Sequence, residues 1–489
     1  MFYDSLYIIK KMKDMKTKIF KNFANATLGI ACCMLGTGLF GCDDYLDNVP
    51  KGQKIPTTLE DFTVMLADEY GNCREDVSQA IILLNDRYVS AANLAYYELW
   101  NANYMWDESA DRIFMNKSDE TTYYNSYTGI NTANLIIENA LSATNATEGE
   151  RLQAIAQAKM LRASKYFTLV NYYAKQYNAV TAQQDGGVPL ITSANVNAPY
   201  TQPSVQDIYD FILGDIEGAL PNLPDEPQNV LYASKGSAHA LAARVYLQMS
   251  NYGEALKHAE AALTFNDKLF DWVAFYNENK TVVTTPDVYQ NITSPMGHDF
   301  CENYNFCHGA SSNAGNDLQL RVDRGEQFEK GDAAFQCRWK IRTVGSDTYY
   351  NPNLRGFFNR GGMTTTEVYL IEAECLARTG HVDQAMTVLN NVRQKRLLPA
   401  DYKALTANNA DEAIDLIAKT KGEAMILTIV PFCDARRLNL EPAHARTLTK
   451  SENGQTFSLS PTSHLWVMPF PQGAVSNSGN GTVTQNVER

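Results

Sequence analysis

The chain has few cysteines and no long apolar run. Nine cysteines occur in 489 residues, which excludes a small scaffold held together by disulfides and leaves packing as the main source of stability. The longest largely apolar run, residues 28–40, is shorter than the ~20 residues that a membrane-spanning helix needs. No segment of the sequence therefore predicts a permanent transmembrane helix.

Positive charge and catalytic motifs are also scarce. The formal net charge is −13, and such an acidic chain is not expected to bind nucleic acid. The sequence has no Gly-x-Ser-x-Gly elbow, no Walker-type glycine loop and no His-Glu-x-x-His pair. The sequence therefore lacks common signatures of hydrolases, nucleotide-binding enzymes and zinc peptidases. We expect the protein to have no cofactor.

The N-terminal region has the order of a bacterial lipoprotein signal. Lysines precede the apolar run, and the run leads into Cys42. We expect residues 1–41 to be the signal peptide, with Met1 or Met15 as its start, and Cys42 to become the acylated N-terminus of a tether over residues 42–57. The alternative is an ordinary secretory signal with a chance cysteine.

Small and apolar residues recur at three- and four-residue spacing over much of the chain. The longest such stretch is 151–177, and a second predicted helix starts after Pro203. Residues 237–263 and 366–392 each have the small and aromatic residues of a tetratricopeptide-type helix pair. We therefore predict a mainly α-helical protein whose folded part spans residues 58–489.

One long region and the C-terminal tail lack this periodicity. Residues 270–360 are rich in Gly, Asn, Asp and aromatic residues, and residues 458–489 are also irregular. Loops this long are uncommon unless they bind something. The composition therefore predicts a binding role for the long irregular region.

Six motifs follow one another in the order found in one protein family. They are Cys42 with the acidic residues after it, then residues 158–167, 187–190, 366–393, 434–437, and 466–471 with 485–486. On these motifs the chain resembles the SusD/RagB-like nutrient-binding outer-membrane lipoproteins over nearly its whole length after Cys42. Two departures, at residues 421–426 and just after residue 486, concern helix packing near the C-terminus.

The resemblance implies a SusD-like fold. This fold is mainly α, with tetratricopeptide-like helix pairs as a scaffold and long irregular, loop-rich ligand-binding insertions. It divides the folded part into an N-terminal part at about 58–230, a helix-pair core at about 231–265 and 364–440, a loop-rich insertion at about 266–363, and an irregular tail at 458–489.

The resemblance also implies a function. A member of this family would be lipid-anchored to the outer membrane of a Gram-negative bacterium and face the cell exterior. It would bind an oligosaccharide, deliver it to a SusC-like TonB-dependent transporter, and catalyse nothing. The alternatives are a peptide-binding RagB-like member, a surface glycoside hydrolase, and a tetratricopeptide assembly scaffold.

Two groups of aromatic residues mixed with amides and charges suit sugar recognition. A pyranose ring offers an apolar CH face for stacking and a rim of hydroxyl groups for polar side chains. The candidate ligand-binding residues of the first group are Asn85, Asp86, Arg87, Trp100, Asn103, Tyr104 and Trp106. Those of the second group are Trp272, Tyr276, Tyr304 and Trp339. The alternative interpretation is that these rings are buried core residues.

Two other groups of residues have the types needed for chemistry. His298, Cys301, Cys307 and His308 could form a four-ligand zinc site, but we favour a loop with a disulfide or free thiols and expect no metal. Paired carboxylates, Asp107 with Glu108 and Glu372 with Glu374, could be a glycosidase acid and base. We interpret them instead as solvated or ion-paired helix positions, so no catalytic residue is predicted.

Overall fold

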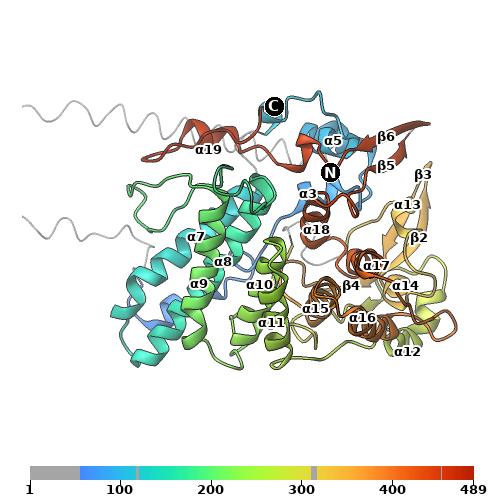
Figure 1. Ribbon diagram of the computed structural model, residues 1–489, viewed down its shortest axis with the longest axis horizontal. Coiled ribbons are helices and arrows are strands. Elements are labelled where there is room, and N and C mark those ends of the chain that lie inside the picture. Colours follow the sequence, from blue (N-terminus) through green and yellow to red (C-terminus); the bar gives the residue numbers. More distant parts are fainter. Residues whose placement is uncertain (1–55, 117–120, 310–316, 453, 489) are drawn as a thin grey trace, which may run out of the picture. The chain divides into compact units, whose positions relative to one another are not determined.

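The computed structural model describes residues 56–489, except 117–120, 310–316, 453 and 489. Cys42 and the predicted signal peptide lie outside the described residues. The described part is mainly helical, which confirms the predicted fold class (Figure 1). Within it, no helix combines the length and the apolar character needed to cross a membrane.

The first half of the described chain is built from helices. They are α2 (Leu59–Leu66), α3 (Ser78–Leu83), α4 (Ala91–Tyr96), α5 (Glu98–Met105), α6 (Arg112–Met115), α7 (Thr121–Asn139), α8 (Glu148–Tyr173) and α9 (Val205–Ala219), with short 3-10 turns η2 (Ala140–Ser142) and η3 (Leu220–Asn222). Thr147 and Glu150 form a capping box that starts α8, and Ser204 with Asp207 does the same for α9. Both helices were predicted, and α8 begins and ends a few residues earlier than expected.

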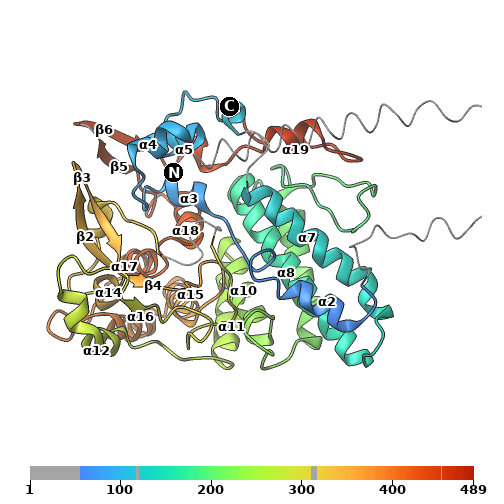
Figure 2. The ribbon, with the colours of Figure 1, turned by 180° about the vertical axis from the view of Figure 1, so that it is seen from behind.

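The second half contains the two predicted helix pairs. Its helices are α10 (Lys235–Gln248), α11 (Tyr252–Leu263), α12 (Trp272–Thr284), α13 (Val322–Gly325), α14 (Ala333–Arg338), α15 (Thr365–Arg378), α16 (Val382–Arg396), α17 (Ala410–Ala424), α18 (Val430–Leu438), η5 (His464–Trp466) and α19 (Gln472–Ser476). The pairs are α10 with α11 and α15 with α16. Because α11 packs against α15, the two pairs lie side by side although an irregular region separates them in sequence (Figures 1 and 2).

Small side chains let these helices approach closely. Ala240, Ala243, Ala255 and Ala259 are buried in one cluster between α10, α11 and α15. A buried ion pair crosses the same interface, where Arg244 of α10 donates two hydrogen bonds of 2.7 and 2.6 Å to Glu367 of α15.

Helix α8 lies between α7 and α9 and forms the centre of the N-terminal part. Its Arg162 donates two hydrogen bonds to Asp215 of α9, at 2.7 and 2.8 Å, and one to Asn134 of α7 at 2.7 Å. One buried guanidinium therefore connects three helices.

Short two-stranded sheets complete the described fold. Strands β1 (Ile292–Thr293) and β4 (Leu354–Arg355) are parallel, whereas β2 (Trp339–Val344) pairs antiparallel with β3 (Asp347–Pro352) and β5 (Leu448–Glu452) with β6 (Gln455–Leu459). The region that lacks helical periodicity in the sequence contains α12, α13 and α14 as well as four of these strands. Tertiary contacts can hold helices whose own periodicity is weak.

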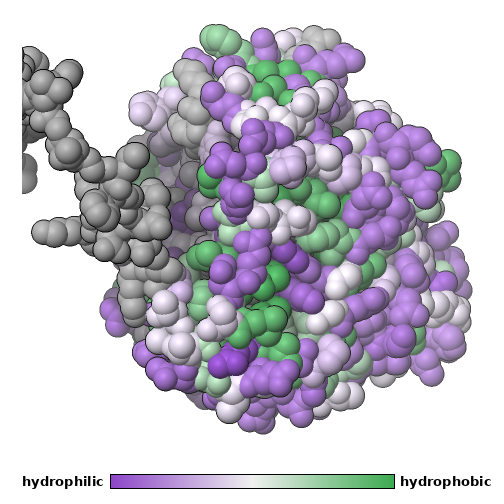
Figure 3. Space-filling model, turned by 90° about the vertical axis from the view of Figure 1, so that its left-hand side faces the viewer, coloured by the Kyte–Doolittle hydropathy of each residue, from purple (hydrophilic) through white to green (hydrophobic). Residues whose placement is uncertain are grey.

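Helix α5 lies near two of the hairpins (Figures 1 and 2). In both ribbon views α5 lies beside the β5–β6 hairpin, and the β2–β3 hairpin stands close by (Figures 1 and 2). On the side that carries α7 to α9, hydrophilic and hydrophobic side chains are interspersed (Figure 3). The surface beside α5 brings aromatic rings and charged side chains together.

Candidate functional site

Helices α4 and α5 present a stack of aromatic rings at the surface. Ser90 caps α4 by accepting a hydrogen bond from the Asn93 amide, and the extended backbone of Tyr97 separates the two helices. The rings of Tyr96 and Tyr97 meet edge to face with their centroids 4.7 Å apart, and the rings of Tyr97 and Trp100 are stacked with their centroids 4.4 Å apart. Tyr96 is 77% exposed and Tyr97 43% exposed, so this aromatic stack faces solvent.

Arg87 lies against the aromatic stack. Its guanidinium carbon is 5.2 Å from the centroid of the Trp100 ring, a cation–π distance. Within the described part of the chain, Arg87 makes no side-chain hydrogen bond or ion pair, and its Nε is buried without a partner. Burial, together with the nearby Arg360 charge, lowers the pKa of Arg87. A desolvated guanidinium with unused donors is suited to bind hydroxyl or carboxylate oxygens.

A groove of about 1100 Å³ runs beside α4 and α5. Its lining includes Tyr88, Asn101, Arg321, Asp323, Asp347 and Glu452. The ring of Tyr88 stacks on Tyr349 of β3 with centroids 4.6 Å apart. The groove therefore combines a second flat aromatic surface with hydrogen-bonding groups from four separate parts of the chain.

The charges of the groove are mostly paired with one another. Arg321 donates to Asp323 at 2.9 and 3.0 Å, to Glu452 at 2.8 Å and to the Tyr104 hydroxyl. Lys450 donates to the Asn85 side chain at 2.7 Å, and its Nζ lies 3.8 Å from the centroid of the Tyr104 ring. Burial, with the Arg321 charge adding to it, lowers the pKa of Lys450 to about 7.

The structure divides the first predicted group into surface and interior residues. Arg87 and Trp100 are half-buried at the aromatic stack, and Tyr104 lines the groove although its ring is buried. Asn103 is fully buried and donates to Gln79. Trp106 is buried and donates to the Leu83 carbonyl.

Two polar candidates are occupied by contacts within the fold. Asn85 has a left-handed backbone, with φ at 58°, and its amide donates to carbonyls of α3 and to the Tyr104 carbonyl. Asp86 is buried and forms an ion pair with Arg324 at 2.6 Å. Both side chains are buried and make their contacts within the fold, so neither offers an exposed group to a ligand.

The second predicted group is not brought together with the first. Trp272 and Tyr276 of α12 lie in one buried cluster, while Tyr304 packs between α10 and α15. Trp339 is buried in the main core and donates to the Leu318 carbonyl. All four rings are less than 10% exposed. These rings fill space inside the fold, and none of them lines the groove beside α4 and α5.

Sequence reasoning missed several groups at the candidate site. Tyr96 and Tyr97 belong to the same aromatic run as Trp100, but nothing in the sequence shows which rings of that run are exposed. Arg321, Lys450 and Glu452 come from distant segments that only the fold brings beside α5. No local sequence signal could have selected them.

One member of each carboxylate pair has a contact within the described fold, and the two loop cysteines are not bonded to each other. Glu374 accepts hydrogen bonds from Arg437 and Arg378, and these guanidiniums outweigh its burial and lower the pKa of its carboxyl. Asp107 is exposed and accepts from Ser109. Cys301 and Cys307 are free thiols, so the disulfide is not formed.

The family model described as "Starch-binding associating with outer membrane", SusD-like_3, matches residues 44–247. This part of the chain is similar to the SusD-like family. Solved SusD-like structures have the same fold as this chain. A SusD superfamily protein from Bacteroides thetaiotaomicron has 17% identity and a TM-score of 0.64, over 88% of this chain and 100% of that one.

Two further SusD-like structures have the same fold. A SusD superfamily protein from Bacteroides vulgatus has 16% identity and a TM-score of 0.65, covering 88% of this chain and 99% of that one. A laminarin-binding SusD-like protein has 17% identity and a TM-score of 0.61, covering 89% of this chain and 100% of its own. No curated protein matches the chain.

Proposed function

We propose that this SusD-like protein is a cell-surface lipoprotein that binds an oligosaccharide with the aromatic stack and passes it to a SusC-like TonB-dependent transporter. It is anchored through Cys42 to the outer membrane of a Gram-negative bacterium and catalyses no reaction. The observation that carries the proposal is the exposed stack of Tyr96, Tyr97 and Trp100 beside the unpaired Arg87.

The chemistry of the stack matches that of a sugar ring. Flat rings cover the apolar CH face of a pyranose, and the unused donors of Arg87 meet its hydroxyl oxygens. The neighbouring groove offers acceptors on Asp323 and Glu452 for hydroxyl hydrogens. A chain of several sugar units could therefore extend from the aromatic stack into the groove.

The family supports the location and the ligand class. The matching model is described as starch-binding and outer-membrane-associated, and one structure with the same fold is named as laminarin-binding. The lipoprotein signal that ends at Cys42 supports a lipid anchor. Delivery to a transporter follows from the family resemblance.

A peptide ligand is the second candidate. The groove walls carry fixed charges of both signs, on Arg321, Asp323 and Glu452, and a peptide with charged side chains would pair with them. The exposed aromatic stack favours a sugar over a peptide. A peptide backbone needs hydrogen-bond donors and acceptors, and aromatic rings offer it few of them.

Isothermal titration of the chain without residues 1–42 tests the proposal. The ligands are laminari-oligosaccharides, malto-oligosaccharides and a set of mixed peptides, with Trp100→Ala measured alongside. We expect micromolar to millimolar affinity for one glycan series and weakened binding in the variant.

Other outcomes would select another function. Binding of peptides alone would replace the oligosaccharide by a peptide. New reducing ends released from a bound glycan would show a glycoside hydrolase. Tight binding of the transporter without affinity for any nutrient would favour an assembly scaffold.

A further inference from the structure

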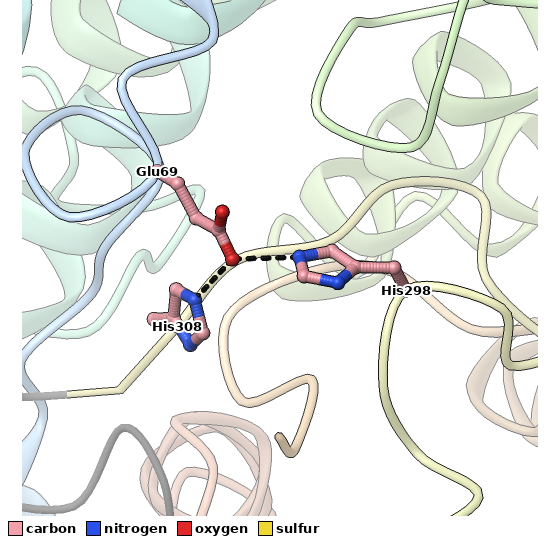
Figure 4. A group of neighbouring side chains, drawn as sticks. All are labelled: Glu69, His298 and His308. Carbon is pink, nitrogen blue, oxygen red and sulfur yellow. Dashed lines mark hydrogen bonds and ion pairs between the residues drawn. The ribbon is translucent and has the colours of Figure 1, made fainter. Parts of the chain in front are cut away.

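Two segments far apart in the sequence meet at Glu69, His298 and His308 (Figure 4). The Nε2 atoms of the two histidines each lie 2.6 Å from the same oxygen, Oε1 of Glu69. All three candidate ligand atoms lie within 4.8 Å of one another. The two imidazole rings are nearly perpendicular, at 87°, so they converge on one point from different directions.

The backbone holds these side chains in place. The His308 amide donates to the Cys73 carbonyl and the His308 carbonyl accepts from the Glu75 amide, both at 2.7 Å. The segment that carries Glu69 is thereby tied to the segment that carries His308. Asn303 donates to the His298 carbonyl at 3.1 Å, which closes the loop between the two histidines. The backbone of the fold therefore fixes where the three side chains lie relative to one another.

Aromatic rings wall the cluster. Phe306 lies 4.4 Å from the His298 ring and 4.8 Å from the His308 ring, measured between centroids. Tyr70 stacks on His308 at 5.0 Å. The His308 side chain is fully buried, whereas those of His298 and Glu69 are 34% and 24% exposed. A small cation can therefore enter from solvent while apolar walls strengthen its attraction to the carboxylate.

We propose that Glu69, His298 and His308 form a binding site for a zinc ion. Two imidazoles and one carboxylate are a common three-ligand set for zinc, and they leave a fourth position for water. Imidazole-rich sets favour zinc, copper and nickel over magnesium and calcium. The bound ion cross-links the segment after α2 to the loop before the C-terminal helix pair.

The geometry needs only a small adjustment. In a tetrahedral site with bonds of about 2.1 Å, ligand atoms lie ~3.4 Å apart. The present nitrogen–oxygen contacts of 2.6 Å would each open by ~0.8 Å. Side-chain torsions of Glu69 and the partly exposed His298 can supply this movement without breaking the backbone contacts of His308.

The competing account is a metal-free hydrogen-bond network. In it the Glu69 carboxylate accepts hydrogen bonds from both histidines. Burial opposes ionisation of this carboxyl, but hydrogen bonds from His308 and His298 outweigh it and lower the pKa of Glu69. Such a network would stabilise the loops without any affinity for zinc, so a direct binding measurement separates the two accounts.

The proposed metal site differs from the four-ligand zinc site that the residue types in the sequence suggested. Cys301 and Cys307 were the other two candidate ligands, but neither belongs to the group of converging ligand atoms. Glu69, more than 200 residues away in sequence, supplies the third ligand instead. Only the fold reveals it.

Zinc titration of the full chain tests the site. The protein is treated with EDTA, desalted, and titrated with ZnCl₂ against a chromophoric chelator. We expect one zinc ion per chain and at least ~100-fold weaker binding in His298→Ala, since even outer-shell partners of a metal contribute 10–100-fold to its affinity. The matched control is His258→Ala, which removes a half-buried histidine whose Nδ1 lies 3.0 Å from that of His239. Zinc binding should be unchanged in this control.

Two further measurements keep the test decisive. Glu69→Gln retains the shape and a hydrogen-bond acceptor but loses the charge, so it should also weaken zinc binding. Co²⁺ bound to the wild-type chain should give a strong visible absorption band that His298→Ala lacks.

The proposal is overturned if the wild-type chain binds no zinc in competition with the chelator, or if His298→Ala and Glu69→Gln bind it as tightly as wild type. A lower Tm for His298→Ala with no zinc affinity in the wild type would show the metal-free network. None of these outcomes depends on a glycan.

Discussion

Replacing Trp100 by alanine should weaken glycan binding by about tenfold. Trp100 stacks on Tyr97 with centroids 4.4 Å apart, and Arg87 lies 5.2 Å from its centroid. A sugar ring that covers about 60 Å² of this indole gains ~1.5 kcal/mol at ~25 cal/mol per Å². That free energy corresponds to roughly a tenfold change in Kd.

The substitution should leave the fold intact. Trp100 packs only at the edge of a small satellite cluster around Val89 and Tyr104, so its loss removes no part of the main core. Titration calorimetry at constant buffer gives Kd, and thermal unfolding gives Tm. Trp100→Phe retains a flat ring and should lie between wild type and Trp100→Ala.

The matched control is Phe265→Ala, which truncates another partly exposed ring. Phe265 is 40% exposed and stacks on His239, in the α10–α11 pair. Its removal should leave glycan affinity unchanged. If the folded Trp100→Ala protein binds its glycan as tightly as wild type, the aromatic stack is not the binding surface and the reasoning fails.

Three further predictions concern charged groups. Arg87→Met should weaken glycan binding several-fold with little change in Tm, because its guanidinium makes no side-chain hydrogen bond or ion pair within the described fold and loses only the contact with the Trp100 ring; unchanged affinity by calorimetry would contradict its role. Asp215→Ala should destabilise the protein by ~3–5 kcal/mol in urea unfolding, because it leaves the buried Arg162 charge unpaired; a loss below about 1 kcal/mol would contradict that reasoning. The folded pKa of Lys450 is about 7, below its usual 10.5, so between these pH values the unfolded chain binds a proton that the folded chain lacks. The free energy of unfolding should therefore rise from pH 7 to pH 9, by at most about 1.4 kcal/mol per pH unit from this group, relative to Lys450→Met; parallel curves for the two proteins would refute the pKa shift.

The sequence by itself determined the helical framework. Periodic small and apolar residues predicted α8, α9 and both helix pairs, and capping residues such as Ser204 marked where helices begin. The order of motifs predicted the family. These features are local, or repeat along one helix face, so they can be read without knowing what packs against that face.

Only the tertiary structure decided which side chains reach the surface. Trp272 and Trp100 look alike in sequence, yet one fills a core beside α14 and the other lies at an exposed stack. Burial of a ring depends on which neighbour covers it, and that neighbour comes from a distant segment. For the same reason, the sequence did not show that Glu69 lies next to His298 or that Lys450 lines the groove. Their proximity exists only after long-range backbone contacts have closed the loops between them.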